Sequence, residues 1–354
     1  MSDHHHSHLW PGVPLALVAA AAFGISTPLA KVLLGSMDPW IMAGLFYLGS
    51  GIGLSIIIAA RKLRGTKVQE ASLRGTDIPW LLGTIFFGGI LGPVLLLFGL
   101  NQADATSASL LLNLEATFTL ILAWVVFREH VDRRLFIGAV FIVAGAMVLS
   151  WQGGIGKWNY GSVLIAMACL SWAIDNNLTR KISATDPFIL AAIKGLAAGL
   201  VNTALAFYAG AHWPEVLKLS EAMALGFVSY GLGLVIFIFA LRYLGTARTG
   251  AYYGTAPFIG ALFATLIFGT AITPVLLLAG GLRGIGAWLH LAERHEHDHI
   301  HQPLDHEHAH VHDEHHQHSH QGPVVEPHSH SHSHEPLRHK HHHYPDIHHR
   351  HEHG

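Results

Sequence analysis

Two charged residues lie deep inside long apolar runs, and they are the first candidates for chemistry in this sequence. Glu115 is ten residues into the run that begins at Ala105, which places it about 15 Å from the start of a helix. Arg283 lies eleven residues into another run. An ionised side chain in hydrocarbon costs at least a few kcal/mol unless it is paired or hydrated. Desolvation favours the protonated form of a carboxylate, so Glu115 could load and release a proton. A permanent Glu115–Arg283 ion pair is the structural alternative.

Further polar groups interrupt two other apolar runs. Asp175, Asn176 and Asn177 form a cluster near the end of one, and Lys194 lies about two turns into the next. For Lys194 the alternative is a side chain that snorkels to water. Nearby aromatic residues either line a cavity or simply pack. The candidate residues of a substrate or proton pathway are Glu115, Asn113, Asp175, Asn176, Asn177, Lys194, Trp172, Tyr252, Tyr253 and Arg283.

Histidine dominates the tail from Leu291 to Gly354, which holds 24 of the 31 histidines, 11 acidic residues and four basic residues. Imidazole is a common ligand of Zn²⁺, Ni²⁺, Co²⁺ and Cu²⁺, so the tail predicts divalent-metal binding, whereas an expression tag would be uninterrupted. Almost no apolar residues are available for a core, which predicts a tail that is disordered without a ligand. The candidate metal ligands are His295, His297, His299, His301, His306, His308, His310, His312, His315, His316, His318, His320, His328, His330, His332 and His334.

The elements that must position these residues are membrane-spanning helices. Hydrophobic residues make up 51% of the chain and charged residues 12%, although the polar tail dilutes the average. A soluble protein with buried helices would show amphipathic stripes, which these runs lack. Runs of about 20 residues, enough to cross about 30 Å of hydrocarbon, predict ten helices. Their ranges are 13–34, 39–60, 78–100, 105–127, 134–152, 158–179, 187–210, 221–241, 247–269 and 272–291.

The hydrophobic pattern occurs twice, at an offset of about 150 residues. Residues 23–31 correspond to 172–180, and Asp38 and Asp186 are each followed by proline. Because each copy has an odd number of spans, the two copies must point in opposite directions, as in the inverted repeats of secondary transporters. The predicted parts are a cytoplasmic N-terminus (1–12), a first repeat (13–152), a second repeat (153–291) and the histidine-rich tail (292–354).

Basic residues predict the orientation in the membrane. Twelve fall in alternate loops of the ten-helix arrangement, and the opposite loops hold only Lys157 and Lys218. This bias places both termini in the cytoplasm, in an inner (plasma) membrane of the bacterial type. The twelve residues are Arg61, Lys62, Arg64, Lys67, Arg74, Arg128, Arg133, Arg134, Arg180, Lys181, Arg242 and Arg248.

Small residues predict a compact bundle. Glycines spaced four apart place two small residues on one helix face and let backbones approach closely. Three prolines, Pro28, Pro93 and Pro257, lie inside predicted spans and can kink them. The lone cysteine, Cys169, has no intrachain partner and is interpreted as a packing residue. The glycine pairs are Gly49/Gly53, Gly88/Gly92, Gly195/Gly199 and Gly280/Gly284.

Several of these segments resemble the EamA-type transporters of the drug/metabolite transporter superfamily. Residues 105–119 and 122–129 resemble the fourth helix, 138–139 and 144–145 the fifth, and 248–253 with 257–261 the matching part of the second repeat. Two positions depart from the pattern: Ala116 stands where many relatives have proline, and Thr270 where an acidic residue often closes helix 9. The resemblance implies ten helices around a central cavity and the transport of small metabolites or toxic compounds, driven by an ion gradient or by exchange.

The sequence leaves three functions open. The first is a metabolite or drug permease whose tail binds metal, the second a divalent-metal exporter fed by the tail, and the third a membrane-tethered metal store. A glycine-rich phosphate loop, a Cys-x-x-Cys pair and a nucleophile elbow are all absent from the sequence, which predicts no enzyme and no required cofactor. The expected partners are the lipid bilayer, a small-molecule substrate and divalent metal ions, without nucleic acid, and a homodimer is left open.

Overall fold

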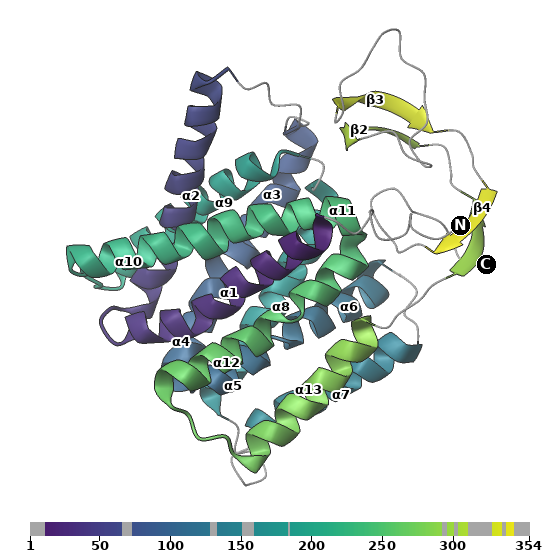
Figure 1. Cartoon of the computed structure of the whole chain (residues 1–354). Helices are drawn as coiled ribbons and strands as arrows, with labels where there is room; N and C mark the ends of the chain where they lie inside the picture. The colour runs from purple at the N-terminus through teal and green to yellow at the C-terminus, as the bar shows by residue number, and fades with distance from the viewer. Residues whose placement is uncertain are drawn as a thin grey trace.

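Helices form almost all of the structure (Figure 1). The computed structural model describes residues 11–65, 73–127, 133–150, 159–182, 185–291, 296–300, 304–310, 328–334 and 338–342. The α-helices are α1 (Gly12–Leu34), α2 (Pro39–Leu63), α3 (Ile78–Thr84), α4 (Gly92–Gln102), α5 (Ala105–Leu111), α6 (Leu114–Phe127), α7 (Arg133–Ser150), α8 (Tyr160–Thr179), α9 (Pro187–Tyr208), α10 (Val216–Gly226), α11 (Gly233–Tyr253), α12 (Ala256–Phe268) and α13 (Pro274–Leu291). Short 3-10 turns, η1 (Gly75–Asp77) and η3 (Arg180–Ile182), and π-helical turns, η2 (Ile85–Leu91) and η4 (Phe227–Leu232), connect some of them.

Among the described residues, six helical segments are long and apolar enough to cross a membrane, and three shorter helices are also apolar. Large apolar side chains such as Val125, Leu266 and Trp288 are exposed on the outside of the bundle, where a soluble protein would carry polar groups. The chain is therefore a multi-pass helical membrane protein. The six segments are Gly12–Leu34, Pro39–Leu63, Gly75–Gln102, Ala105–Val126, Pro187–Tyr208 and Val216–Ala240, and the shorter helices are Phe136–Val148, Ala256–Phe268 and Pro274–Leu289.

Several predicted helices differ from the structure. The predicted helix 105–127 is divided into α5 and α6, and the predicted helix 247–269 is divided between the end of α11 and α12. The predicted helices 78–100 and 221–241 contain the π-helical turns η2 and η4. The predicted loop between 241 and 247 lies within α11. Hydrophobicity does not predict where a helix is interrupted or widened into a π-helical turn, because neither change alters the pattern of apolar residues. Pro257 is the second residue of α12 and does not kink a longer helix, since its missing N–H is tolerated in a first turn.

Helix α11 bends so that both of its ends lie along α1. Ala240 and Tyr252 both pack in one small cluster with Ala16. In a straight helix twelve residues would separate them by about 18 Å. The chain therefore reverses its direction between Ala240 and Tyr252, although this stretch is helical.

Helices of the first half pack antiparallel on helices of the second half. In the α2–α9 pair, Gly51 lies against Gly195, and Leu48 lies against Gly199. Along this contact the residue numbers rise in one helix and fall in the other, so the two helices are antiparallel. The α7–α13 pair, side by side at the lower edge of Figure 1, and the α5–α12 pair pack in the same sense. Both α2 and α9 begin alike, with an aspartate cap that accepts backbone N–H groups and a proline at the first position.

Close approach explains three of the four predicted glycine pairs. A Cβ at Gly49 would overlap the Met223 backbone, and one at Gly195 would overlap Gly51. At Gly49 and Gly195 glycine is required because two backbones touch there, whereas Gly88 and Gly92 make room for the side chains of Asp175 and Trp172. The fourth pair, Gly280 and Gly284, differs from the prediction, since a Cβ at either position meets open space. Its spacing alone did not indicate a contact.

Gly49→Val should therefore destabilise the protein, whereas Gly280→Val should not. Both substitutions place the same side chain in a helix, but only the first forces two helices apart, at an expected cost of about 1–3 kcal/mol. Thermal unfolding of the two purified variants in one detergent checks this. Equal melting temperatures would contradict the assigned helix contact.

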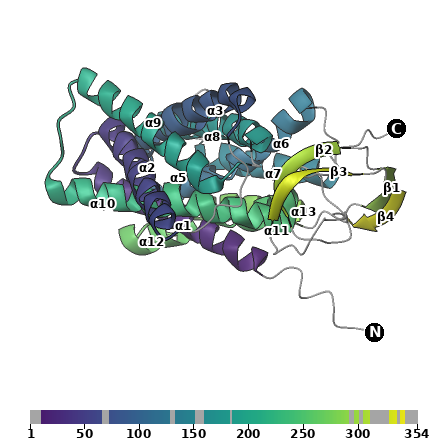
Figure 2. The ribbon, with the colours of Figure 1, turned by 90° about the horizontal axis from the view of Figure 1, so that it is seen from above.

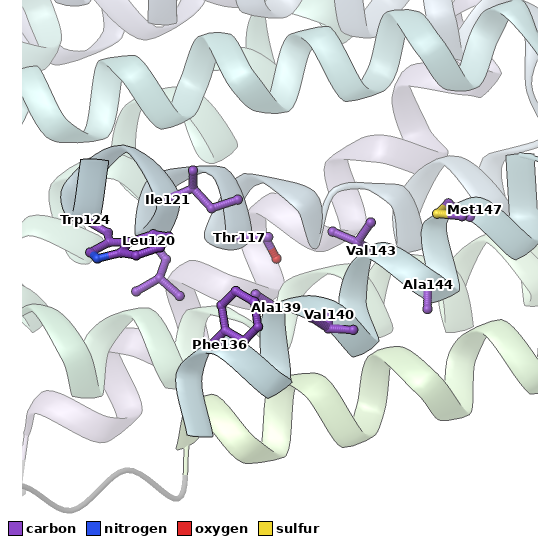
Figure 3. Close-up of a pocket in the computed structure, with 10 residues that line it drawn as sticks. All are labelled: Thr117, Leu120, Ile121, Trp124, Phe136, Ala139, Val140, Val143, Ala144 and Met147. Carbon is purple, nitrogen blue, oxygen red and sulfur yellow. The ribbon is translucent and has the colours of Figure 1, made fainter. Parts of the chain in front are cut away.

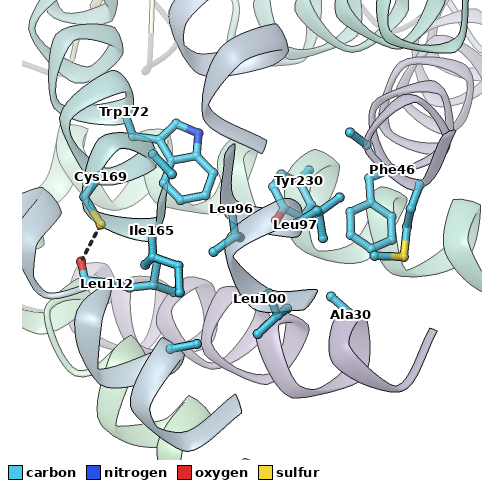
Figure 4. Packing of buried hydrophobic residues seen from close by; sticks show 14 of the residues in the cluster. Ala30, Phe46, Leu96, Leu97, Leu100, Leu112, Ile165, Cys169, Trp172 and Tyr230 are labelled. Carbon is cyan, nitrogen blue, oxygen red and sulfur yellow. Dashed lines mark hydrogen bonds between the residues drawn. The ribbon is translucent and has the colours of Figure 1, made fainter. Parts of the chain in front are cut away.

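Apolar and aromatic side chains fill the centre of the bundle (Figure 4). Trp172, Leu97 and Tyr230 lie within this core, to which most of the helices contribute. Cys169 is fully buried there, and its Sγ lies 3.7 Å from the Leu111 carbonyl oxygen. The cysteine is thus a packing residue, as predicted.

Four short strands occur in the histidine-rich tail, where the sequence predicts disorder. They are β1 (Glu296–Ile300), β2 (Leu304–His310), β3 (His328–His334) and β4 (Arg338–His342). β1 pairs antiparallel with β4, and β2 with β3, at one side of the helical bundle (Figures 1 and 2). Alternation of histidine with small or acidic residues has the period of two that suits a strand, and this explains the difference.

Candidate functional site

An ion pair inside the bundle joins α8 to α9. Lys194 Nζ lies 2.5 Å from Asp175 Oδ2, and these residues are 8% and 7% exposed. Thr179, one turn further along α8, donates its hydroxyl to Asp175 Oδ1 at 3.2 Å. Lys194 therefore does not snorkel, which is one of the two alternatives that the sequence left open. Burial makes each charge costly without the other, so the pair acts as a unit.

Glu115 is held by the same helix from its other side. Asn176 Nδ2 donates to Glu115 Oε1 at 2.8 Å and lies 3.4 Å from the Thr119 hydroxyl oxygen. Glu115 stands in the first turn of α6, where the helix dipole favours a negative charge. Asn177 instead donates to the Ala173 carbonyl at 2.9 Å within α8. Consecutive residues of α8 thus reach α9 and α6, which places the two carboxylates in one polar cluster.

The π-helical turn η2 borders this cluster. Its wider turn releases carbonyls from the regular helix ladder, and such turns are frequent at functional sites. Side chains from α2, α8 and α9 donate to three consecutive carbonyls: Ser171 Oγ to Phe87 at 2.9 Å, Trp172 Nε1 and Tyr47 Oη to Gly88 at 3.1 and 2.6 Å, and Asn202 Nδ2 to Gly89 at 3.0 Å.

Gly88 is the point where η2 touches the ion pair. A Cβ there would overlap the Asp175 carboxylate and lie 2.6 Å from Lys194 Nζ. The absence of a side chain thus makes room for the ion pair. Sequence reasoning identified Gly88 only as half of a spacing motif, and it missed Tyr47 and Asn202, whose roles depend on contacts across the bundle.

Aromatic rings lie beside the polar cluster, around Phe23 of α1. Ring centroids of Trp172 and Tyr253 lie 5.8 Å from that of Phe23, and the centroid of Tyr230 lies 6.0 Å from it. The sequence singled out Trp172 and Tyr253 but missed Phe23 and Tyr230. Tyr252 lies elsewhere, against the small cluster that α1 and α11 share.

Arg283 does not form the ion pair with Glu115 that the sequence suggested. Its side chain is fully buried, and Nη1 donates to the Leu110 carbonyl near the end of α5. Its Nε and Nη2, like Asn113 Nδ2, have no hydrogen-bond partner among the described residues. Equal depth along two helices was the basis of the prediction. It does not fix the direction in which a side chain points.

A groove of about 480 Å³ lies between α6 and α7 (Figure 3). Its walls are apolar apart from Thr117, which is fully buried and whose hydroxyl has no hydrogen-bond partner in the described part of the chain. The Asp175–Lys194 pair does not line this groove. The ion pair is buried, whereas Glu115 and Asn176 are half-buried.

Within the described part of the helical bundle, no three His, Cys, Asp or Glu side chains come close enough to hold a metal ion. Nine candidate ligands lie on the tail strands: His297 and His299 in β1, His306, His308 and His310 in β2, and His328, His330, His332 and His334 in β3. Seven lie outside the described residues: His295, His301, His312, His315, His316, His318 and His320.

The sequence profile of the EamA-like transporter family matches residues 10–151 and 159–292, once in each half of the chain. A transporter of Methanothermobacter thermautotrophicus is 28% identical over 73% of this chain and 79% of its own length. An inner-membrane transporter of Escherichia coli, YedA, is 25% identical over 70% of this chain and 79% of its own.

Two further similarities extend the comparison. A probable terminal-alkyne amino-acid exporter of Streptantibioticus cattleyicolor is 24% identical over 75% of this chain and 92% of its own. A solved crystal structure superposes with a TM-score of 0.58 and 20% identity, over 79% of this chain and 98% of that chain. The resemblance inferred from the sequence is thereby confirmed, and the solved structure supports the fold.

Proposed function

Because this chain belongs to the EamA-like transporter family, we propose that it is a secondary transporter of small organic metabolites in an inner (plasma) membrane. The observation that carries the proposal is the polar cluster of Glu115, Asn176, Asp175 and Lys194 inside an apolar bundle. Polar groups at membrane depth are costly and mark substrate or ion pathways. We assign cargo contact to the ion pair and proton handling to Glu115.

The proposed architecture has ten spans in two inverted repeats of five. The antiparallel packing of α2 on α9, α5 on α12 and α7 on α13 supports it, because each pair joins corresponding helices of the two halves. The π-helical turns η2 and η4 also occupy corresponding positions. For orientation we propose that both termini are cytoplasmic. The Arg61 guanidinium, 3.7 Å from the Phe188 ring centroid, places the end of α2 and the start of α9 at one face, as the basic loops require.

Amino-acid-like compounds are the cargo class that we favour. The relative from Streptantibioticus cattleyicolor is named as an exporter of an amino acid. A probable amino-acid metabolite efflux pump of Salmonella typhimurium is 28% identical over 49% of this chain. An adjacent carboxylate and ammonium suit a cargo with both charges, whereas a metal exporter needs several ligands within the bundle.

A resistance screen tests the function. A strain that overexpresses the full chain and one with an empty vector are challenged with toxic amino-acid analogues, other organic toxins, Zn²⁺, Ni²⁺ and Co²⁺. We expect resistance to at least one organic compound. Resistance to metals alone would replace the permease with a metal exporter, and resistance to nothing, together with metal retention at the membrane, would favour a tethered store.

We propose that the tail binds divalent metal near the cytoplasmic face. The backbone register supports this, since it sets histidine opposite histidine at every second pair of β2 and β3: His306 with His332, His308 with His330, and His310 with His328. Positions directly opposite on paired strands are neighbours on one face of a sheet. Such a tail can raise the local metal concentration without forming the transport site.

Deletion of residues 293–354 should remove most Zn²⁺ and Ni²⁺ binding and leave transport of the organic cargo intact. Binding by the full chain should weaken as the pH falls from about 7 to 6, because a protonated imidazole cannot bind a metal. Isothermal titration with each metal, at both pH values, measures this. Unchanged stoichiometry after deletion would show that the tail has another role.

A further inference from the structure

The Asp175–Lys194 pair is buried between α8 and α9, in contact with Gly88 of the π-helical turn η2. Resting on the proposed transport function, we propose that this pair is an exchangeable lock that selects zwitterions. In the empty carrier Lys194 neutralises Asp175. In the loaded carrier the ammonium of the cargo pairs with Asp175, and the carboxylate of the cargo pairs with Lys194.

Charge balance at a buried site carries the selectivity. Both residues are at least nine-tenths buried, so neither charge can be left without a partner at small cost. A cargo with only an ammonium would bind Asp175 and leave Lys194 unpaired, and a cargo with only a carboxylate would leave Asp175 unpaired. A zwitterion satisfies both groups at once. The empty and loaded carriers then hold the same net charge in this cluster.

The geometry allows the pair to open. Asp175 and Lys194 belong to different helices, so a small displacement of α9 from α8 separates them without breaking either helix. Asp175 is also held by Thr179, whereas Lys194 has a flexible four-carbon stem, so the lysine is the partner that moves. Gly88 and Gly89 of η2 border the pair and carry no side chain to block a new group.

Glu115 is distinct from this lock. Asn176 holds it on the α6 side of α8, away from the α9 side where Lys194 lies. Cargo selection and proton handling can therefore be changed separately, by substitutions in neighbouring residues. If the pair is a lock, variants of Asp175 and Lys194 should change which charged group of the cargo is accepted. Variants of an ion pair with only a structural role would leave this preference unchanged.

Matched sets of probes test this in the purified full chain. The first set is alanine, ethylamine and propionate; the second is leucine, 3-methylbutylamine and 4-methylpentanoate; the third is phenylalanine, 2-phenylethylamine and 3-phenylpropionate. Within a set the members share a skeleton and differ in charged groups. Binding is measured in detergent at low temperature by the change in intrinsic tryptophan fluorescence and by isothermal titration.

We expect the wild type to bind the zwitterion of at least one set roughly 100-fold more tightly than either singly charged member, since a buried group left unpaired is strongly discriminated against. Lys194→Gln should shift the preference towards the amine, and Asp175→Asn towards the acid. The double variant Asp175→Asn/Lys194→Gln, which leaves no buried charge unpaired, should lose the zwitterion preference while remaining folded. Lys218→Gln, in the half-exposed Lys218–Glu221 pair, is the matched control and should behave as the wild type.

Equal binding of amine and amino acid by the wild type would overturn the lock, as would an unchanged preference in all three variants. Failure of every probe to bind would overturn it as well. Any of these results leaves the transport proposal standing if the resistance screen still identifies an organic cargo. A screen that finds none would instead contradict the transport function itself.

Discussion

Glu115→Gln is expected to abolish transport while leaving the protein abundant and folded. Glutamine preserves the shape of the side chain and can still accept the hydrogen bond that Asn176 donates to Glu115 Oε1. It cannot take up and release a proton. If a proton cycles through Glu115, active transport should fall to the background level of empty vesicles. Uptake of the cargo identified in the resistance screen, into proteoliposomes with an imposed pH gradient, measures this.

The control for this variant is Glu221→Gln, which removes a carboxylate of the half-exposed Lys218–Glu221 pair and should transport normally. Exchange of labelled for unlabelled cargo, without a pH gradient, separates proton coupling from cargo binding. Loss of gradient-driven transport with residual exchange would assign Glu115 to coupling. Wild-type transport by Glu115→Gln across the pH gradient would exclude a proton role for this carboxylate.

The second large effect is expected on stability, from Lys194→Gln alone. Removing the ammonium leaves the Asp175 carboxylate buried without its counter-charge, which typically costs about 3–5 kcal/mol. The double variant Asp175→Asn/Lys194→Gln should recover much of this loss, because neither remaining amide carries a charge. Thermal unfolding of the single and double variants, purified in the same detergent and at the same pH, measures the difference.

Lys218→Gln is again the control, since an exposed ion pair contributes only about 0–1 kcal/mol. A double variant less stable than the Lys194→Gln variant would contradict the assignment of the loss to an unpaired charge. Equal melting temperatures for wild type and Lys194→Gln would show that the pair is not buried as the contacts indicate.

Taken together, the contacts give α8 a central role. Through Asp175 it reaches α9, through Asn176 it reaches α6, and through Ser171 and Trp172 it holds the π-helical turn of the third span. A displacement of α8 relative to its neighbours would therefore change the ion pair, the Glu115 contact and η2 at the same time. This coupling offers a physical route from cargo binding to a change in proton handling.

The sequence by itself determined the class of protein and the approximate limits of its helices. Apolar runs of about 20 residues are stable as helices in the hydrocarbon of a membrane. The starts of helices are marked by capping residues, as at Asp38 and Asp186. The cost of burying charge also made Glu115, Asp175 and Lys194 candidates before any contact was known. These properties depend on neighbours in the chain and on the surrounding medium, so a linear pattern is enough to predict them.

Only the tertiary structure decided which of these groups meet. Equal depth along two helices suggested an ion pair between Glu115 and Arg283. The direction of each side chain instead brings Glu115 to Asn176 and Arg283 to the Leu110 carbonyl. The role of Gly88 likewise depends on α8 and α9 packing against η2, since nothing in the sequence near Gly88 refers to Asp175. Contacts between helices are set by the rotation and packing of whole elements, and hydrophobic periodicity leaves that rotation undetermined when a run is apolar on every side.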